Sequence, residues 1–328
     1  METAWSRPMY STSVVIPVYN AELTLRNLYD QLMPAMEELT ESFEVVMVED
    51  CGRDGSWDII RELSARDVRV RGIRLRRNYG QHSALLCGIR AARHEVIVTM
   101  DDDLQNPVSE IHLLLEKLAE GYDVVYGAPE EEQHVFWRNA ATRLTKTALR
   151  NATGVDSVRH VSAFRALRTS LREGFASYRS PNVSIDVLLA WVTSRFAVVR
   201  VRHEPRVAGQ SDYTLSMLIR HAVDLMTGFS VLPLRFASFT GFGFTLFGFG
   251  VLAWVLGRYV MTGSRVPGFP FLASIIAIFS GAQLFALGIV GEYLARIHLR
   301  SMDRPPYVIG ETCGAGAERG RDGHTAEG

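Results

Sequence analysis

Lysine is nearly absent from this sequence of 328 residues, because Lys117 and Lys146 are the only lysines among 35 basic residues. Arginine therefore carries almost all of the positive charge, which fits either phosphate recognition or a compositional bias. The formal net charge of -1 argues against a nucleic-acid-binding protein, which would need a basic surface. Cysteine is also scarce. Cys51, Cys87 and Cys313 form neither a Cys-x-x-Cys pair nor the Cys/His spacing of a zinc site, which is typical of reduced thiols in the cytosol.

Two glycine-rich nucleotide-binding motifs are missing as well. No expected strand is followed by Gly-x-Gly-x-x-Gly or by Gly-x-x-x-x-Gly-Lys, so the sequence indicates neither a nicotinamide enzyme nor a P-loop ATPase. Residues 1–10 contain no apolar stretch long enough for a signal peptide. We expect residues 1–11 to be disordered.

What the sequence does contain is an alternation of short apolar strands with helices. Strands are expected at 14–16, 43–48, 70–75 and 96–98, and apolar residues at helical spacing follow them. Such an alternation implies parallel strands joined by right-handed crossovers. We therefore expect an α/β domain with a mostly parallel sheet.

Three consecutive carboxylates, Asp101, Asp102 and Asp103, follow the strand expected at 96–98. In an extended chain Asp101, Asp103 and Gln105 project to the same side. Oxygen ligands of this kind suit Mg²⁺ or Mn²⁺ with positions left open for substrate phosphate. Ligands of α/β sheets bind where strands end in this way. The alternative for a lone Asp-x-Asp is a solvated acidic turn that caps the next helix.

Four motifs, in this order, carry a resemblance to a known family. They are Val-Ile-Pro-Val-Tyr-Asn at 15–20, Val-Glu-Asp-Cys-Gly-Arg-Asp-Gly-Ser at 48–56, Arg-Asn-Tyr-Gly-Gln-His-Ser-Ala at 77–84 and Asp-Asp-Asp-Leu-Gln-Asn-Pro at 101–107. Together they resemble the family-2 glycosyltransferases with a Rossmann-like GT-A domain. The subgroup they resemble is the polyprenyl-phosphate glycosyltransferases, which includes dolichol-phosphate mannose synthase, the bactoprenol glucosyltransferases and the undecaprenyl-phosphate aminoarabinose-type transferases. The resemblance spans roughly residues 12–310 and implies a GT-A domain at 12–212.

The resemblance also implies a nucleotide-sugar site with a divalent cation, Mg²⁺ or Mn²⁺. Asp50 matches the acid that reads the base, although the usual Asp-Asp is Glu49-Asp50 here. The other matched positions are Pro17, Tyr19 and Glu22 beside the base and ribose, Asp101 and Asp102 in the nucleotide-sugar site, and Asp101, Asp103 and Gln105 as metal ligands. The usual Asn-Glu-Glu is Asn20-Ala21-Glu22, which keeps the matched acid.

For the acceptor phosphate, the resemblance points to two short arginine motifs. Arg165 ends Ser-Ala-Phe-Arg at 162–165, and Arg206 and Ser211 lie in a stretch similar to the family's Arg-x-x-Gly-x-Ser-x-Tyr. We expect Arg165 and Arg206 to act as a catalytic clamp on the donor and acceptor phosphates. Arg138 is a further candidate, although the helical spacing at 133–150 also fits a half-buried helix. The basic residue usual before the tyrosine is replaced by Asp212.

Two long uncharged runs decide the expected cellular setting. Residues 236–257 and 271–291 contain no charged side chain, and each reaches roughly 32 Å as a helix at about 1.5 Å per residue, which is enough to span a membrane. We expect transmembrane helices at about 236–258 and 271–294 within a membrane region at 235–300. An amphipathic juxtamembrane segment at 213–234 should precede them. An ordinary domain helix is the alternative for that segment.

The arginines near these runs predict an orientation. Arg220, Arg235, Arg296, Arg300 and Arg304 flank the outer ends, against Arg258 and Arg265 in the connection, which places both ends of the chain in the cytoplasm. We expect residues 301–328 to form a largely disordered cytoplasmic tail. Glycines at 241, 243, 248, 250, 281 and 288 permit close helix packing, and we expect a homo-oligomer, with a tetramer as one candidate.

The expected activity is transfer of one sugar, with inversion, from a nucleotide diphosphate sugar to a polyprenyl phosphate at the cytoplasmic face of the cell membrane. The product would supply a lipid-linked sugar for the cell envelope. Because the acceptor phosphate is already an anion, stabilising the leaving diphosphate matters more than a strong base. The alternatives are a processive polysaccharide synthase, whose Gln-x-x-Arg-Trp motif is missing, and a non-catalytic membrane scaffold.

Overall fold

The computed structural model describes residues 10–129, 162–181, 183–204, 232–262, 269–302 and 304–315. The chain divides into two compact units. The first comprises Met1–Ala140, Thr153–Tyr213 and Arg304–Gly328, and the second comprises Ala141–Ala152 and Thr214–Asp303.

The first unit is built on a mixed sheet of eight described strands in the order β7-β5-β6-β4-β1-β2-β3-β8. The four neighbours β3, β2, β1 and β4 are parallel, whereas β6 and β8 are antiparallel to the strands beside them. The strands are β1 (Ser11–Val18), β2 (Ser42–Glu49), β3 (Val70–Leu75), β4 (Val96–Thr99), β5 (Val124–Pro129), β6 (Arg165–Arg168), β7 (Phe196–Val201) and β8 (Ile309–Gly314). The expected mostly parallel α/β sheet is confirmed.

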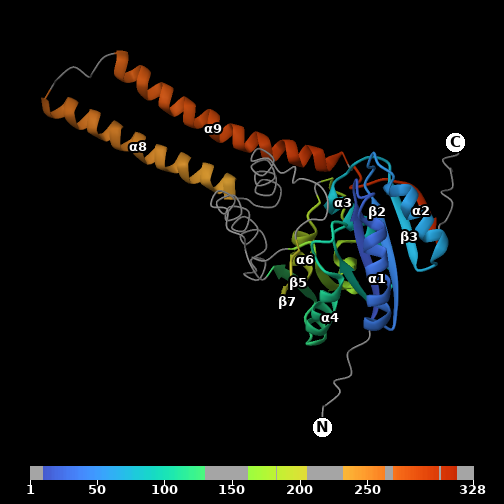
Figure 1. Cartoon of the computed structure of the whole chain (residues 1–328). Coiled ribbons are helices and arrows are strands. Elements are labelled where there is room, and N and C mark those ends of the chain that lie inside the picture. Colours follow the sequence, from blue (N-terminus) through green and yellow to red (C-terminus); the bar gives the residue numbers. More distant parts are fainter. Residues whose placement is uncertain are drawn as a thin grey trace, which may run out of the picture. The chain divides into compact units, whose positions relative to one another are not determined.

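Helices cover both faces of this sheet (Figure 1). One face carries α1 (Leu25–Leu39), α2 (Ser56–Arg66), η1 (Val108–Glu110) and α4 (Ile111–Ala119), and the other carries α3 (Gln81–Ala91), η3 (Thr169–Phe175) and α6 (Ile185–Val192). Because successive strand residues point to opposite faces, Val14 and Ile16 enter the first core while Val15 enters the second. Central strands buried on both sides are mostly apolar, which explains the apolar runs in the sequence.

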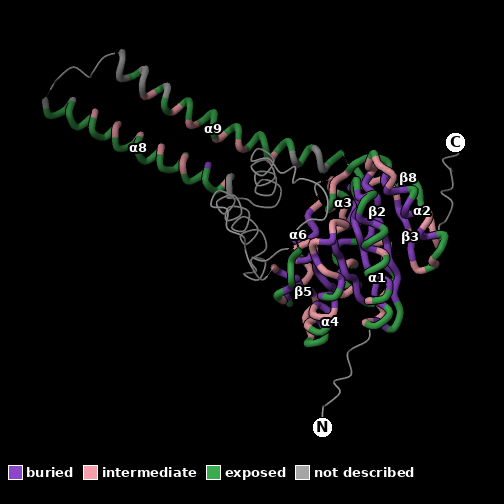
Figure 2. The backbone as a smooth tube through the Cα atoms, viewed as in Figure 1, coloured by how far each residue is buried: buried purple, intermediate pink, exposed green. Residues whose placement is uncertain are grey.

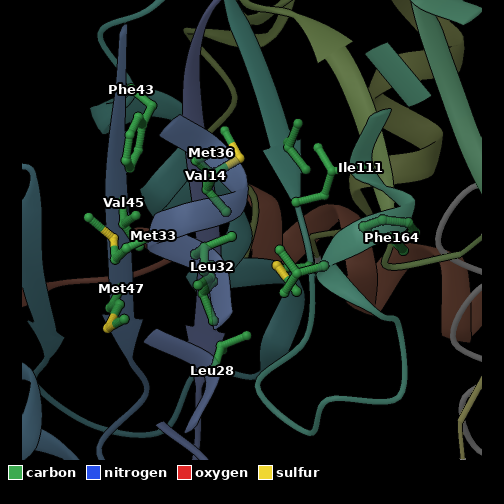
Figure 3. Packing of buried hydrophobic residues seen from close by; sticks show 14 of the residues in the cluster. Val14, Leu28, Leu32, Met33, Met36, Phe43, Val45, Met47, Ile111 and Phe164 are labelled. Carbon is green, nitrogen blue, oxygen red and sulfur yellow. The ribbon is translucent and has the colours of Figure 1, made fainter. Parts of the chain in front are cut away.

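The first core is dominated by one face of α1. Its buried residues are Leu25, Leu28, Leu32, Met33 and Met36, which recur at the spacing of a helix face. Figure 3 shows these side chains against the strands, with Leu28, Leu32, Met33 and Met36 near Val14, Phe43, Val45 and Met47, and with Ile111 and Phe164 on neighbouring elements. Each buried side chain of this size contributes about 1.5–3 kcal/mol.

The strands that follow β1 in the sequence are added on both sides of it in the sheet. From β1 the chain proceeds to β2 and then β3 on one side, whereas β4 pairs on the other side of β1. The direction in which strands are added therefore reverses between β1 and β4. In sheets of this type, ligands bind at the carboxyl ends of the strands where the order reverses in this way.

Part of the expected disordered tail is instead ordered. Residues 309–314 form β8, which pairs antiparallel with β3 from Arg71↔Gly314 to Leu75↔Ile309, and Figure 2 shows β8 beside β3. The indole of Trp57 donates to Glu311 at 3.0 Å. The polar composition of the tail misled the prediction for these residues, because an extended segment can be stabilised by hydrogen bonds to a strand distant in sequence. Residues 316–328 lie outside the described residues.

The second unit contains two long apolar helices, α8 (Leu232–Thr262) and α9 (Phe269–Ser301). Leu234–Arg258 and Ile278–Ala295 within them are long and apolar enough to cross a membrane. The rings of Phe244 and Phe279 meet edge to face with centroids 5.8 Å apart. The two apolar spans are thus confirmed as helices, while most of the amphipathic segment expected at 213–234 lies outside the described residues.

Candidate functional site

A cavity of about 230 Å³ opens at the carboxyl ends of the parallel strands, where the strand order reverses. It is lined by residues that follow β1, β2, β3 and β4, together with the first turns of α3. These residues are Pro17, Val18, Tyr19, Asp50, Asn78, Gly80, Gln81, Ala84, Asp101, Asp102 and Asp103. Six predicted site residues therefore meet in one place: Pro17, Tyr19, Asp50 and the three consecutive aspartates.

Three loops around this cavity adopt unusual backbone conformations. Among the described residues, the non-glycine residues with positive φ are Asn20 (53°), Cys51 (55°) and Leu104 (60°). They follow β1, β2 and β4 respectively. Left-handed non-glycine residues carry a conformational cost and cluster at functional sites. Their coincidence around one cavity supports the assignment of this cavity as the functional site.

The loops after β1 and β2 are joined by reciprocal hydrogen bonds. Asn20 Oδ1 accepts from the backbone N–H of Arg53 at 2.9 Å, and Glu22 accepts from the N–H of Gly55 at 2.9 Å. The N–H of Glu22 donates in turn to Asp54 at 2.9 Å. Glu22 is not one of the described residues that line the cavity. The structure thus places Glu22 in the support of the loops, although the resemblance implied a position beside the ribose.

Asp50 holds the loop that follows β3. Its two carboxylate oxygens accept hydrogen bonds from the N–H groups of Tyr79 and Gly80, each at 2.7 Å. Asp50 is 3% exposed, and burial raises the pKa of its carboxyl, while the two N–H groups act in the opposite direction. A carboxylate can accept about four hydrogen bonds. Asp50 therefore fixes this loop and keeps acceptor capacity for a ligand in the cavity.

The three aspartates after β4 lie in a turn, so the extended geometry expected for them is wrong. β4 ends at Thr99, and the turn includes Leu104 with positive φ. Asp101 accepts from Gln81 Nε2 at 2.6 Å, Asp102 accepts from the N–H of Tyr19 at 3.1 Å, and Asp103 accepts from the N–H of Gln105 at 3.1 Å.

The positions of these carboxylates are therefore set by bonds to two other segments, at Gln81 and Tyr19, and by one bond within the turn itself. The bond from Tyr19 to Asp102 joins the ends of β1 and β4 directly. Gln105 is absent from the described residues that line the cavity, and its carbonyl accepts from the N–H of Glu204 at 2.8 Å.

The negative charges in this turn influence one another. Burial, together with the charges of Asp101 and Asp103, raises the pKa of Asp102 to about 7, while the hydrogen bond from the N–H of Tyr19 acts in the opposite direction. Among the described residues, no group of three or more His, Cys, Asp or Glu is arranged as a complete metal site. Asp101 and Asp103 nevertheless supply carboxylate oxygens on one cavity wall. Such a donor set fits a cation that shares its coordination with substrate phosphates and water, as Mg²⁺ commonly does.

Arg165 is buried and does not line the cavity, although the resemblance implied a phosphate contact at the rim of the site. The side chain is 1% exposed and its guanidinium forms an ion pair with Asp186. Tyr126 donates its hydroxyl to the same carboxylate at 3.0 Å. The antiparallel register pairs Arg165 with Thr99 in the middle of the sheet, so the side chain is enclosed by β5 and α6. The remaining acceptor-site candidates, Arg138, Arg206 and Ser211, lie outside the described residues.

Several cavity residues were not assigned from the sequence. Asn78, Gly80, Gln81 and Ala84 line the cavity and belong to the motif at 77–84 that carried part of the resemblance. The signal was the glycine of this motif, whose φ of 89° is one that side chains rarely adopt. Gly80 begins the tight entry into α3, and this entry places Gln81 against Asp101.

The sequence is similar to that of known proteins of one family. The family model described as "Glycosyl transferase family 2" matches residues 13–175. The undecaprenyl-phosphate 4-deoxy-4-formamido-L-arabinose transferase of Pseudomonas aeruginosa (strain LESB58) is 36% identical over 305 residues, which cover 92% of this chain and 90% of the relative. The transferase of the same name from Aeromonas hydrophila subsp. hydrophila is 33% identical over 303 residues, which cover 90% and 92% of the two chains.

A solved structure shares the fold. The crystal structure of glucosyl-3-phosphoglycerate synthase from Mycobacterium tuberculosis, in complex with Mn²⁺, uridine diphosphate and phosphoglyceric acid, aligns with a TM-score of 0.51. The alignment covers 66% of this chain and 76% of that chain, at 18% sequence identity. At this identity the likeness concerns the fold alone.

The burial of Arg165 leads to a prediction about stability. Replacing Arg165 by alanine leaves Asp186 as a buried charge without its cation, which costs about 3–5 kcal/mol, and should lower the melting temperature of the detergent-solubilised protein by on the order of 10 °C. The matched control is Arg168→Ala in the same strand, because Arg168 is part-exposed and 3.9 Å from Asp123. An exposed pair contributes about 0–1 kcal/mol. Equal melting of the two variants, with transfer lost only in Arg165→Ala, would restore the phosphate-binding role.

Proposed function

The chain belongs to glycosyl transferase family 2, and we propose that it transfers a single sugar from a nucleotide diphosphate sugar to a polyprenyl phosphate. It is a glycosyltransferase by membership of that family. The observation that carries the finer proposal is the cavity between the ends of β1 and β4, which brings Asp50 together with Asp101, Asp102 and Asp103. The names of the relatives and the two apolar helices support a lipid phosphate as the acceptor.

The charge of the cavity determines how a diphosphate could enter it. Two like charges about 4 Å apart repel by about 4 kcal/mol at an effective dielectric constant of about 20, so the aspartates alone would oppose a diphosphate. A divalent cation bound there, Mg²⁺ or Mn²⁺, supplies the charge that stabilises the leaving diphosphate. Asp101 and Asp103 are the residues that would hold it. Mn²⁺ in the Mycobacterium tuberculosis synthase is consistent with this proposal.

The residues of this chain then bind and orient the donor. Pro17 and Tyr19 form one wall of the cavity, and Asp50 offers its remaining acceptor capacity toward a base. Asp102 ties the wall to the acidic turn through the N–H of Tyr19. The acceptor phosphate attacks the anomeric carbon as an oxygen anion while the bond to the diphosphate breaks. Because that nucleophile is already ionised, we assign no general base.

The acceptor site is proposed from the sequence and the relatives. Arg206 and Ser211, with Arg138 as a further candidate, are the proposed contacts to the lipid phosphate. We propose that both ends of the chain and the catalytic domain lie on the cytoplasmic side of the cell membrane. The product would then supply a lipid-linked sugar to a cell-envelope glycan or lipid.

The role of the acidic turn can be tested with Asp103→Asn, which keeps the size of the side chain but removes a charged ligand. Transfer of label from a panel of radiolabelled nucleotide sugars to extractable lipid should fall by at least about 100-fold, a typical loss for one electrostatic stabiliser of a transition state. Titration with Mg²⁺ and Mn²⁺ should no longer restore the parental rate. The melting temperature should stay near that of the parent, because Asp103 lies at the cavity surface.

The matched control for this substitution is Asp58→Asn in α2, whose side chain is 82% exposed and does not line the cavity. It should transfer sugar at the parental rate. If Asp103→Asn did so too, the turn would be a helix cap and the metal assignment would be wrong. One sugar per lipid in the product supports the proposal, whereas polymer would indicate a processive synthase. Absence of transfer with every donor would indicate a scaffold.

The proposed orientation can be tested by cysteine labelling in intact cells. In a chain carrying Cys51→Ser and Cys313→Ser, Ser264→Cys should react with a membrane-impermeant maleimide, because the connection between the two spans would face outward. The control is Ser170→Cys, an exposed position in η3, which should react only after the cells are permeabilised. The reverse pattern would contradict the orientation.

A further inference from the structure

The C-terminal segment, defined here as residues 304–315, follows α9 and returns to the sheet of the first unit. It lies against the elements that carry the cavity loop, defined as residues 76–80 between β3 and α3. Asn78 and Gly80 of this loop line the cavity, as does Gln81 at the start of α3. No residue of this segment lines the cavity, although the segment contacts the elements on both sides of the cavity loop.

The first set of contacts is to β3 and the start of the cavity loop. β8 pairs with β3, and the register shifts between Arg74 and Leu75 where the loop approaches. Beyond that shift, the N–H of Arg76 donates to the carbonyl of Val308 at 2.9 Å. The first residue of the cavity loop is thus held by the C-terminal segment itself.

The second set of contacts is to α3, which begins where the loop ends. Tyr307 is half-buried and packs against the second core, which includes the buried Cys87 of α3. The guanidinium of Arg90 lies 5.8 Å from the centre of its ring. Burial raises the pKa of both Tyr307 and Cys87, the latter to about 12, so both groups stay neutral at physiological pH. Tyr307 therefore acts as an apolar anchor on the helix that presents Gln81 to Asp101.

A third contact reaches α2. Trp57 Nε1 donates to Glu311 at 3.0 Å, and Arg74 lies over the Trp57 ring at 6.0 Å while pairing with Glu49 at 3.0 Å. Glu49 precedes Asp50, whose carboxylate binds the N–H groups of Tyr79 and Gly80. The C-terminal segment is therefore connected to the start of the cavity loop, to the helix that follows the loop, and through Trp57, Arg74 and Glu49 to the strand end whose Asp50 binds Tyr79 and Gly80.

From these contacts we propose that the C-terminal segment is a positioning element for donor binding, with Tyr307 as its principal positioning residue. Resting on the proposed function, this assigns to residues that follow the second apolar helix the task of holding the cavity loop in the conformation that receives the nucleotide sugar. A loop held in its binding conformation loses less freedom when the ligand binds. Weakening the anchor should therefore weaken donor binding selectively, without affecting the lipid phosphate.

The test compares Tyr307→Ala with Tyr307→Phe in the full-length protein. The phenylalanine keeps the ring beside Arg90 and loses only the hydroxyl, so it is the matched control. Hydrogen exchange should become faster at residues 78–80 in Tyr307→Ala and stay near parental in Tyr307→Phe. Calorimetry with Mn²⁺ and the diphosphates of uridine, guanosine, cytidine, adenosine and thymidine should show about three- to ten-fold weaker binding in Tyr307→Ala, the effect of losing one aromatic contact. The KM for polyprenyl phosphate should change less than about two-fold, well below that effect.

Glu311→Ala, with Glu311→Gln as its control, is a second probe, because Glu311 is exposed and its loss is compatible with folding. Glu311→Ala should also make hydrogen exchange faster at residues 78–80 and nucleotide binding weaker. Unchanged exchange and binding in both alanine variants would overturn the inference alone. The inference would also be overturned if the melting temperature fell and the KM values for nucleotide sugar and for polyprenyl phosphate rose together. That result would indicate a purely structural role. If the parent bound none of these diphosphates, the proposed function would fail and this inference would fall with it.

Discussion

Like charges held close together are the constraint on which this site depends. Asp50 and the aspartates at 101–103 face one cavity, and their mutual repulsion must be offset by donors fixed in the backbone. The N–H groups of Tyr19, Tyr79 and Gly80 supply part of that compensation. Each of these donors comes from a loop at a strand end. The order of the strands therefore determines which N–H groups can offset the repulsion between the carboxylates. A divalent cation shared with substrate would complete the compensation.

The parts of this structure that could be predicted were those encoded locally. Apolar runs such as 43–48 indicate strands without knowledge of their partners, and Asp50 and Asp101 follow strands in the same way. A parallel sheet then gathers these ends at one edge, so the cavity followed from local signals. Long-range pairings were not accessible. β8 depends on β3, more than two hundred residues earlier in the chain, and its polar composition resembles that of a disordered tail.

The positions of the Arg165 and Glu22 side chains could not be read from the sequence. Both stand in motif-like stretches, yet a motif does not state which way a side chain points. One residue of register in β6 would exchange the inward and outward positions, and in the observed register Arg165 faces Asp186 and Tyr126. Glu22 likewise bonds to Gly55 rather than lining the cavity. Such side chains preserve the shape of the site from a distance, and family motifs can retain them for that reason.

The residues after the second apolar helix add a strand, β8, to the sheet of the first unit. Without β8, β3 would be the last described strand on that side of the sheet, and the start of the cavity loop would lose the hydrogen bond from Arg76 to Val308. Backbone bonds of an unpaired edge exchange readily with water. By pairing with β3 and anchoring Tyr307 on α3, the segment after α9 gives the loop partners on both sides. In this proposal, the order of the loop depends on residues from the far end of the chain.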